Sequence, residues 1–109
     1  MKVVNSFIKK LSDYNGKIAI SHMDCEFSYS ELLENILSYN LNLEELKIKS
    51  GEVVFILDNY SFDSISLFFS LALNGNIIVP VTTENEQEIN ERIKVGQPDW
   101  IFNIRNNSK

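Results

Sequence analysis

The sequence predicts an α/β protein whose second half forms a β-α-β-α-β parallel sheet flanked by helices. An N-terminal helix and a short β-hairpin precede this sheet. Two continuous apolar runs, residues 53–57 and 77–81, are typical of strands buried on both faces of a parallel sheet. The segment that follows each run carries apolar residues at helical spacing. Strands that alternate with helices favour a parallel sheet with right-handed crossovers.

The N-terminal part contains one helix pattern and one hairpin pattern. From Val3 to Leu11, apolar residues recur every three or four positions, which predicts one face of a helix. Residues Asp13 to Gly16 then predict a turn. The alternation from Lys17 to Ser21 indicates a strand, and Phe27 could belong to its partner, with residues 23–24 near the turn.

A second helix is predicted to begin after Ser28. The Ser28 hydroxyl and the Glu31 carboxylate have the spacing of a capping box. One face of this helix is apolar, formed by Leu32, Leu33, Ile36 and Leu37. The pattern allows the helix to end near Asn40 or to continue, less regularly, to Leu46.

The first strand and helix of the sheet follow a turn at residues 49–52. Residues 53–57 predict a buried strand, and Ser61 is a suitable N-cap for the next helix, with Asp63 near its positive end. The helix from Phe62 to Asn74 is apolar nearly all round, so we expect it to be largely buried. Gly75 is expected to end it in the left-handed conformation.

The second crossover has the same organisation. Residues 77–81 predict another buried strand, which should stop near Pro80. Residues 83–86 have the pattern of a second capping box, before a helix from Glu84 to Lys94 with Ile89 and Ile93 as its apolar stripe. Residues 96–98 should close that helix, and residues 100–104 predict a third strand.

The composition limits the classes of function that we expect for this chain. The 109 residues suit one domain, which we expect at residues 1–104 with a polar tail at 105–109. The net charge is −5, with 15 acidic and 10 basic residues and no basic cluster, so nucleic acid is not an expected partner. A single cysteine excludes a disulfide framework. No apolar run approaches the roughly 20 residues of a membrane span, and we expect a cytoplasmic protein.

A few residues are candidates for chemistry. His22 and Cys25 could form half of a metal site or a Cys-His nucleophile, but two ligands do not close a zinc site, and a surface histidine with a partly buried thiol is the simpler interpretation. Asp58 and Asn59 follow a buried strand at its carboxyl end, where α/β sheets bind ligands, and they are also ordinary turn residues. Ser61 favours a cap over a nucleophile, because no nucleophile elbow surrounds it.

Other residues have a structural and a functional interpretation. Phe62, Phe68 and Phe69 could line an acyl pocket, although helical spacing between two buried strands favours core packing. Trp100 could pack under the sheet or mark a surface that another region covers. The acidic helix favours a solvated face over a docking surface; its carboxylates are Glu84, Glu86, Glu88 and Glu91.

Five segments in order carry a family resemblance. Residues 27–32 (FSYSEL) are similar to a Thr-Tyr-x-Glu-Leu segment, and residues 49–54 (KSGEVV) to a Lys-Pro-Gly-Asp-x-Val turn and strand. Residues 58–59 (DN) before an apolar helix, 71–80 (LALNGNIIVP) and 97–102 (QPDWIF) also have counterparts. Together, from residue 17 to 103, the chain resembles the N-terminal region of the adenylate-forming (AMP-binding) superfamily: acyl-CoA synthetases, nonribosomal-peptide adenylation domains and luciferases. Asn74 and residues 81–83 depart from the pattern and leave the subfamily open.

The resemblance implies a fragment of a larger ATP-dependent ligase. Such enzymes use ATP and Mg²⁺ to activate a carboxylic acid as an acyl-adenylate, and usually pass the acyl group to the thiol of coenzyme A or of a carrier protein. Their phosphate loop, ribose-binding Asp and catalytic Lys belong to later regions, so no catalytic, cofactor-binding or metal residue is assigned to this chain. Its four glycines, Gly16, Gly51, Gly75 and Gly96, are too far apart to form a phosphate loop.

Two functions of different classes remain open. In the first, the chain is an inactive scaffold segment of the ligase, its partner is the remainder of that polypeptide, and its bare sheet edge could support a homodimer. In the second, it is a stand-alone α/β interaction module that has kept the scaffold without the chemistry.

Overall fold

The computed structural model describes residues 18–22, 25–58 and 61–104. The predicted N-terminal helix at residues 3–11, the turn at 13–16 and the polar tail at 105–109 lie outside the described residues. The described elements are β1 (Ile18–His22), β2 (Cys25–Ser28), α2 (Tyr29–Leu46), β3 (Val53–Leu57), α3 (Phe62–Leu73), β4 (Ile77–Val81), α4 (Glu86–Gly96) and β5 (Trp100–Asn103). Strands β1 and β2 pair in the antiparallel direction.

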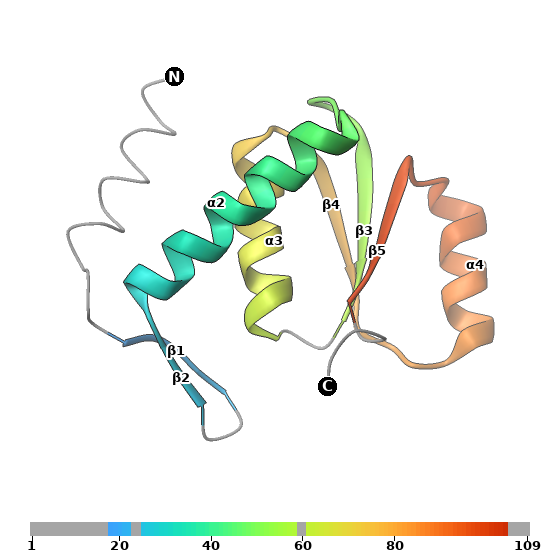
Figure 1. The fold of residues 1–109 in the computed structure, drawn as a ribbon. Coiled ribbons are helices and arrows are strands. Elements are labelled where there is room, and N and C mark those ends of the chain that lie inside the picture. The colour runs from blue at the N-terminus through green and yellow to red at the C-terminus, as the bar shows by residue number, and fades with distance from the viewer. Residues whose placement is uncertain (1–17, 23–24, 59–60, 105–109) are drawn as a thin grey trace.

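Strand β3 is the centre of a three-stranded parallel sheet of order β4-β3-β5. This confirms the predicted β-α-β-α-β arrangement. Figure 1 shows α2 and α3 on one side of the sheet and α4 on the other. The crossover from β3 to β4 and the crossover from β4 to β5 run in opposite directions across the sheet. Crossovers of one hand therefore place α3 and α4 on opposite faces.

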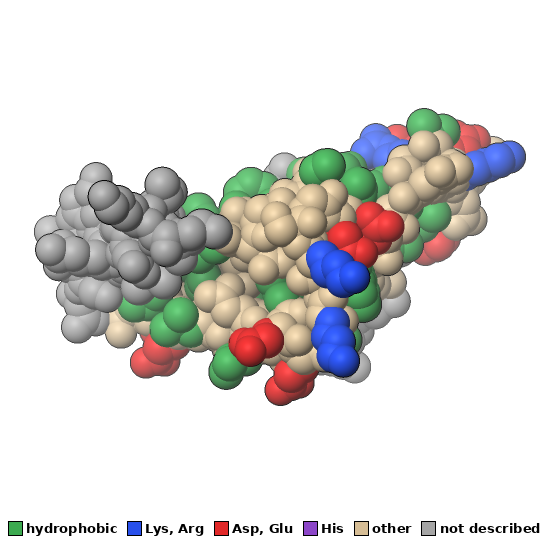
Figure 2. Space-filling view, turned by 90° about the horizontal axis from the view of Figure 1, so that it is seen from above, with side chains coloured by type: hydrophobic (Ala, Val, Ile, Leu, Met, Phe, Trp, Pro, Cys, Tyr) green, Lys and Arg blue, Asp and Glu red, His purple; other side chains and the backbone are tan. Residues whose placement is uncertain are grey.

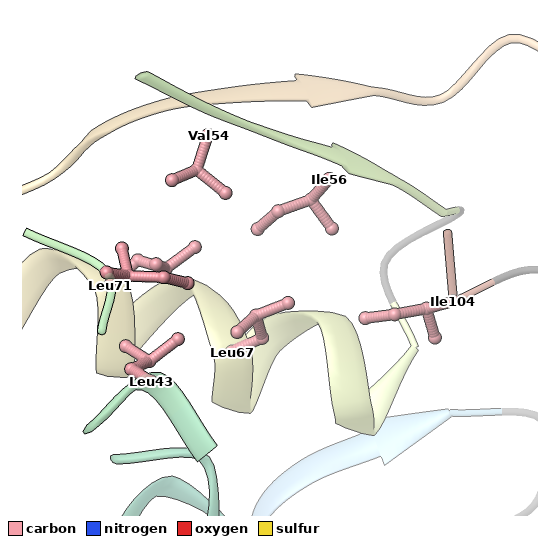
Figure 3. Close-up of a cluster of buried hydrophobic side chains, with 7 residues drawn as sticks. Leu43, Val54, Ile56, Leu67, Leu71 and Ile104 are labelled. Atoms are coloured by element: carbon pink, nitrogen blue, oxygen red, sulfur yellow. The ribbon is translucent and has the colours of Figure 1, made fainter. Parts of the chain in front are cut away.

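Each face of β3 supports its own hydrophobic cluster. Val54 and Ile56 point toward α3, as Figure 3 shows, and pack there against Leu67 and Leu71. Phe55 and Leu57 point the other way; they pack against Val81 of β4 and Ile89 of α4. Four consecutive buried residues explain why this strand reads as a continuous apolar run in the sequence.

Helix α2 confirms its predicted start and takes the longer of its two predicted lengths. Ser28 Oγ accepts from the backbone N–H of Glu31 at 3.1 Å, and the Glu31 side chain accepts from the Ser28 N–H at 3.0 Å. The helix runs to Leu46 because buried Leu43 holds its last turn against the sheet. Lys47 then ends it in the left-handed conformation, with φ 61°.

Strand β4 is not buried as predicted. It is an edge strand, and the Ile77 side chain is 55% exposed. The expectation for α3 also needs correction, because Ser66 and Ser70 are fully buried whereas Phe68 is 42% exposed. The contact between α2 and α3 explains how these two serines can be buried. Ser70 Oγ donates to Asn40 of α2, and Asn35 of α2 donates to Ser66 Oγ.

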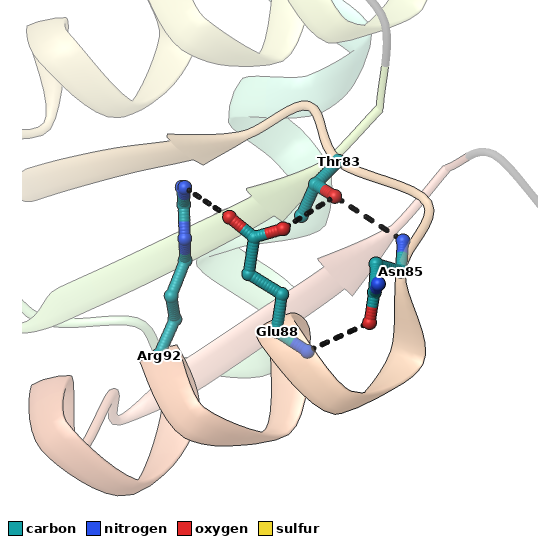
Figure 4. Close-up of polar contacts among 4 residues, drawn as sticks. All are labelled: Thr83, Asn85, Glu88 and Arg92. Atoms are coloured by element: carbon teal, nitrogen blue, oxygen red, sulfur yellow. Dashed lines mark hydrogen bonds and ion pairs between the residues drawn. The ribbon is translucent and has the colours of Figure 1, made fainter.

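The predicted second capping box at residues 83–86 is wrong. Asn85 is the N-cap of α4, and its side-chain oxygen accepts from the backbone N–H of Glu88 at 3.1 Å. Thr83 Oγ1 instead accepts from the Asn85 N–H and donates to Glu88 Oε2, as Figure 4 shows. The helix therefore runs two residues later than expected at both ends, from Glu86 to Gly96.

Candidate functional site

The carboxyl end of β3 carries a buried, hydrogen-bonded carboxylate. Asp58 follows the strand and is only 8% exposed. Its Oδ2 atom accepts hydrogen bonds from the Ser61 hydroxyl and, at 3.3 Å, from the Ser61 backbone N–H. The chain leaves β3 toward α3 and leaves β4 toward α4 on the other face, so a topological switch point lies here. Ligands of open α/β sheets bind preferentially at such points.

Ser61 is the N-cap of α3, as predicted. Its Oγ accepts from the backbone N–H of Ser64 at 3.2 Å while its hydroxyl donates to Asp58. The Asp58 carboxylate thus lies beside the positive end of the helix dipole. The Ser61 hydroxyl donates one hydrogen bond to Asp58 and accepts another from the Ser64 N–H. The geometry therefore favours the structural interpretation of Asp58 and Ser61. Asn59, the other residue predicted here, lies outside the described residues.

A second polar cluster joins α2 to the first turn of α3. Asn35 Nδ2 donates to Asp63 Oδ1 at 3.0 Å and to Ser66 Oγ at 2.9 Å. Burial raises the pKa of the Tyr39 phenol to about 12, and the charge of Asp63, a hydrogen bond with its side chain and the charge of Asp58 act in the same direction. Tyr39 is therefore a neutral hydrogen-bonding group at physiological pH, and not a general base.

This pKa predicts alkaline loss of stability. The folded pKa of Tyr39 lies above the unfolded value of 10.0, so the folded state binds more protons between pH 10 and 12, and the free energy of unfolding falls as the pH rises through that range. Urea unfolding across the range should show this decline. Tyr39→Phe should make the decline shallower; an unchanged slope in this variant would contradict the assignment to Tyr39.

A small apolar hollow lies beside Asp58, between α3 and the carboxyl ends of β3 and β4. Its volume is about 260 Å³, and its lining residues are Ile56, Asp58, Ser64, Ile65, Phe68, Phe69 and Pro80. Ligand pockets usually measure about 300–1,000 Å³, so this hollow has the size for an inserted side chain or a small fragment of a ligand. Its chemistry is that of a packing surface, with one carboxylate at the rim.

The three predicted phenylalanines separate into two roles. Phe62 stacks on Phe27, with ring centroids 3.9 Å apart, and Phe69 packs against the cluster of Leu32 and Ile36. The core interpretation is therefore confirmed for these two. It is wrong for Phe68, which is 42% exposed; Phe68 and Phe69 both line the hollow and meet edge to face.

The remaining candidates are His22, Cys25 and Trp100. His22 and Cys25 are paired across β1 and β2, but their side chains are outside the described part. Among the described residues, no group of three His, Cys, Asp or Glu side chains could hold a metal ion. Trp100 packs against the core beneath the sheet, and its Nε1 donates to Glu52 at 3.1 Å, which confirms the first of its two interpretations.

Charged side chains of both signs occur among the described residues. Figure 2 shows acidic and basic side chains close to one another on one face, with hydrophobic side chains between them. Glu84, which precedes α4, and the α4 carboxylates at positions 86, 88 and 91 are exposed, as the solvated-face interpretation requires. Glu88 pairs with Arg92 at 3.0 Å, an exposed pair worth little to stability. In the described part of the chain, no helix is long and apolar enough to cross a membrane.

Sequence reasoning missed the cluster of Asn35, Tyr39, Asp63 and Ser66. The only available signal was spacing, since Asn35 and Tyr39 are four apart on one helix, while Asp63 and Ser66 are three apart on another. That spacing places each pair on one helix face. Which two faces meet depends on how α2 and α3 pack.

Comparison with solved structures defines the class of fold. The chain has the fold found in the N-terminal subdomain of adenylation domains, over about nine tenths of its length. No protein-family model matches the sequence, and a search of curated proteins finds no match.

Three solved structures illustrate the likeness. The N-terminal subdomain of NpsA from Klebsiella oxytoca is 19% identical, with a TM-score of 0.78, and the match covers 91% of this chain and 26% of that one. A mutant form of coronafacic acid ligase from Pectobacterium brasiliense is 20% identical, with a TM-score of 0.79 and coverage of 90% and 20%. VinN is 15% identical, with a TM-score of 0.77 and coverage of 90% and 26%. At these identities the likeness concerns the fold, and the chain spans only a fifth to about a quarter of each structure.

Proposed function

We propose that this chain is a scaffold segment of an ATP-dependent adenylate-forming ligase that activates a carboxylic acid. The single observation that carries the proposal is the fold match over about 90% of the chain to three different structures of this type. The ordered segments from residue 27 to 102 also support it, because their residues resemble segments of that superfamily in the same order.

The proposal assigns no contact with ATP or Mg²⁺ to the described residues. Gly51 and Gly75 meet at the amino ends of β3 and β4, where the Gly51 N–H donates to the Gly75 carbonyl at 2.9 Å. Phosphate sites of α/β sheets lie at the opposite, carboxyl edge. The proposal therefore assigns ATP, Mg²⁺, the acid and the acceptor thiol, from coenzyme A or a carrier protein, to the remainder of the parent protein. This chain supplies the core and surfaces on which that remainder folds.

The test is acid-dependent exchange of pyrophosphate into ATP. We expect no exchange from the 109-residue chain and clear exchange from the longest natural polypeptide that contains it. Solved structures hold VinN with L-aspartate and NpsA with a 3-hydroxyanthranilyl compound, so amino acids and aryl acids should lead the substrate panel. A folded longer polypeptide that exchanges with no amino, aryl or alkyl acid would remove the ligase proposal and favour the interaction module.

A further inference from the structure

The sequence contains two Asn-Gly dipeptides, Asn15–Gly16 and Asn74–Gly75. Asparagine is a chemically labile residue, because the backbone nitrogen that follows it can attack its side-chain carbonyl carbon. A following glycine favours this attack, since it has no Cβ to crowd the nitrogen or to restrict the backbone. Asn15–Gly16 lies outside the described residues, whereas Asn74–Gly75 joins α3 to β4. Asn74 is also a position where the chain departs from the adenylate-forming pattern, so this dipeptide is a feature of the chain and not of the fold.

The backbone at Asn74–Gly75 has a conformation that prevents the attack. The Gly75 N–H donates to the Ala72 carbonyl at 3.1 Å. The Asn76 N–H donates to the Leu71 carbonyl, also at 3.1 Å, and together these bonds form the Schellman ending of a helix. Ring closure requires the Gly75 nitrogen to lie nearly eclipsed with the Asn74 Cβ about the Cα–C bond. The Asn74 ψ of −6° instead eclipses it with the Asn74 backbone nitrogen, so the folded chain keeps the attacking atom paired and turned away from Cγ.

The Asn74 side chain is held in place as well. Its Nδ2 atom donates to the Ile48 carbonyl at 3.2 Å and to Asn76 Oδ1 at 2.8 Å. Asn76 Nδ2 in turn donates to the carbonyls of Lys49 and Glu52, at 2.7 Å and 3.2 Å. These bonds connect the end of α3 to the segment between α2 and β3. The amide nitrogen that would leave in the reaction is therefore a donor that fixes this junction.

We propose that Asn74 is a deamidation site that the folded state protects and that reacts when the end of α3 opens. Opening frees the Gly75 nitrogen, which loses its proton to water and forms a bond to the Asn74 Cγ. The Cγ–Nδ2 bond breaks, ammonia leaves, and a cyclic imide remains. Water then opens the imide at either carbonyl and gives aspartate or isoaspartate. Gly75 is exposed, so water reaches the junction. The inference does not depend on the proposed ligase function, because the reaction needs only these two residues and water.

The product should not fit the folded junction. Both partners of Asn74 Nδ2, the Ile48 carbonyl and Asn76 Oδ1, are oxygen acceptors. A carboxylate has no hydrogen to donate, so two hydrogen bonds become contacts between oxygen atoms. Isoaspartate also lengthens the main chain inside the Schellman ending. A deamidated chain should therefore refold to a less stable state, and each period of opening removes part of the native population irreversibly.

The first experiment follows deamidation of the 109-residue chain by peptide mapping and mass spectrometry, in buffer and in an unfolding concentration of guanidinium chloride at the same pH and temperature. In the denaturant, Asn74 and Asn15 should react at similar rates, because each precedes a glycine. In buffer, Asn74 should react at least about tenfold more slowly than in the denaturant, because only the open state reacts. Asn15 serves as the standard for an unprotected dipeptide in the denaturant only.

The second experiment compares Asn74→Asp with Asn90→Asp. The first variant imitates one product of the reaction. The second adds the same negative charge at an exposed position of α4. Asn74→Asp should raise the ratio of unfolded to folded chain at least about tenfold, the effect expected from losing two hydrogen bonds. Asn90→Asp should leave that ratio nearly unchanged, because surface substitutions have small effects. Denaturant unfolding measures both.

Three outcomes would overturn the inference. The first is a reaction of Asn74 that is as fast in buffer as in the denaturant. The second is an Asn74 that stays intact in the denaturant while Asn15 reacts. The third is equal stability of the two aspartate variants. Failure of Asn74→Asp to fold, with Asn90→Asp folded, would support the predicted destabilisation, and the wild-type rates would then decide whether the folded state protects the site.

Discussion

Replacing Leu67 with alanine is expected to lower the free energy of unfolding by about 2–5 kcal/mol. Leu67 is fully buried and lies between α2 and the sheet, against Leu43 and Ile56 (Figure 3). The substitution removes apolar contacts and leaves a cavity that neighbours on three elements cannot collapse to fill. A domain is stable by only about 5–15 kcal/mol, so this variant should have a visibly lower urea midpoint.

Two variants calibrate the result. Leu67→Met nearly conserves volume and should cost less than about 1.5 kcal/mol. Leu41→Ala removes a leucine from α2 that is 62% exposed, and it should change stability by no more than about 0.5 kcal/mol. If Leu67→Ala were no more destabilising than Leu41→Ala, the described packing of α3 on β3 would be wrong.

Replacing Asp58 with alanine is expected to cost about 1.5–3 kcal/mol, the range for hydrogen bonds to a charged group. The buried carboxylate accepts from both the hydroxyl and the N–H of Ser61 at the start of α3. Alanine leaves these donors unsatisfied and removes a negative charge from the positive end of the helix. Urea unfolding at neutral pH measures the loss.

Asp58→Asn separates the two contributions. Asparagine keeps a side-chain oxygen that can accept from Ser61, and loses the charge, so its cost should be smaller than that of alanine. Equal costs for both variants would show that the charge dominates. A negligible cost for both would contradict a structural role, and would leave Asp58 as a residue that the fold maintains for another purpose.

Much of the local structure could be predicted from the sequence because its causes are local. The Ser28–Glu31 capping box and the Ser61 cap depend on side chains that reach backbone groups three residues away. The continuous run at residues 53–57 predicted a strand buried on both faces, and β3 is the central strand. Gly75 takes φ +81° at the end of α3, as the helix-end pattern predicted.

The errors arose where two local solutions compete. Thr83 and Asn85 are both good caps, and the sequence around them fits either choice. The structure uses Asn85 as the cap, and Ile89 of the helix packs in the cluster of Phe55 and Leu57. Thr83 keeps a role as a hydrogen-bond partner of Glu88.

Only part of the candidate site could be predicted from the sequence. The carboxyl end of β3 could be selected in advance, because α/β topology makes that edge the usual binding region. Asn35 and Tyr39 could not be linked to Asp63 in advance, because Asn35 and Asp63 are 28 positions apart in the sequence and lie on two different helices. Their side chains resemble ordinary polar positions on an amphipathic helix until a second helix packs on them.

The α/β class, the order of the described elements and the caps at Ser28 and Ser61 could be predicted, because periodicity and hydrogen bonds over three or four residues act within one segment. The sequence did not predict that β4 is an edge strand of the described sheet, or that Phe68 is exposed while two serines of α3 are buried. These features depend on which surfaces meet. Whether a side chain is buried depends on which elements pack together. A hydrophobic pattern indicates that one face of an element is covered, but it does not indicate which element covers that face.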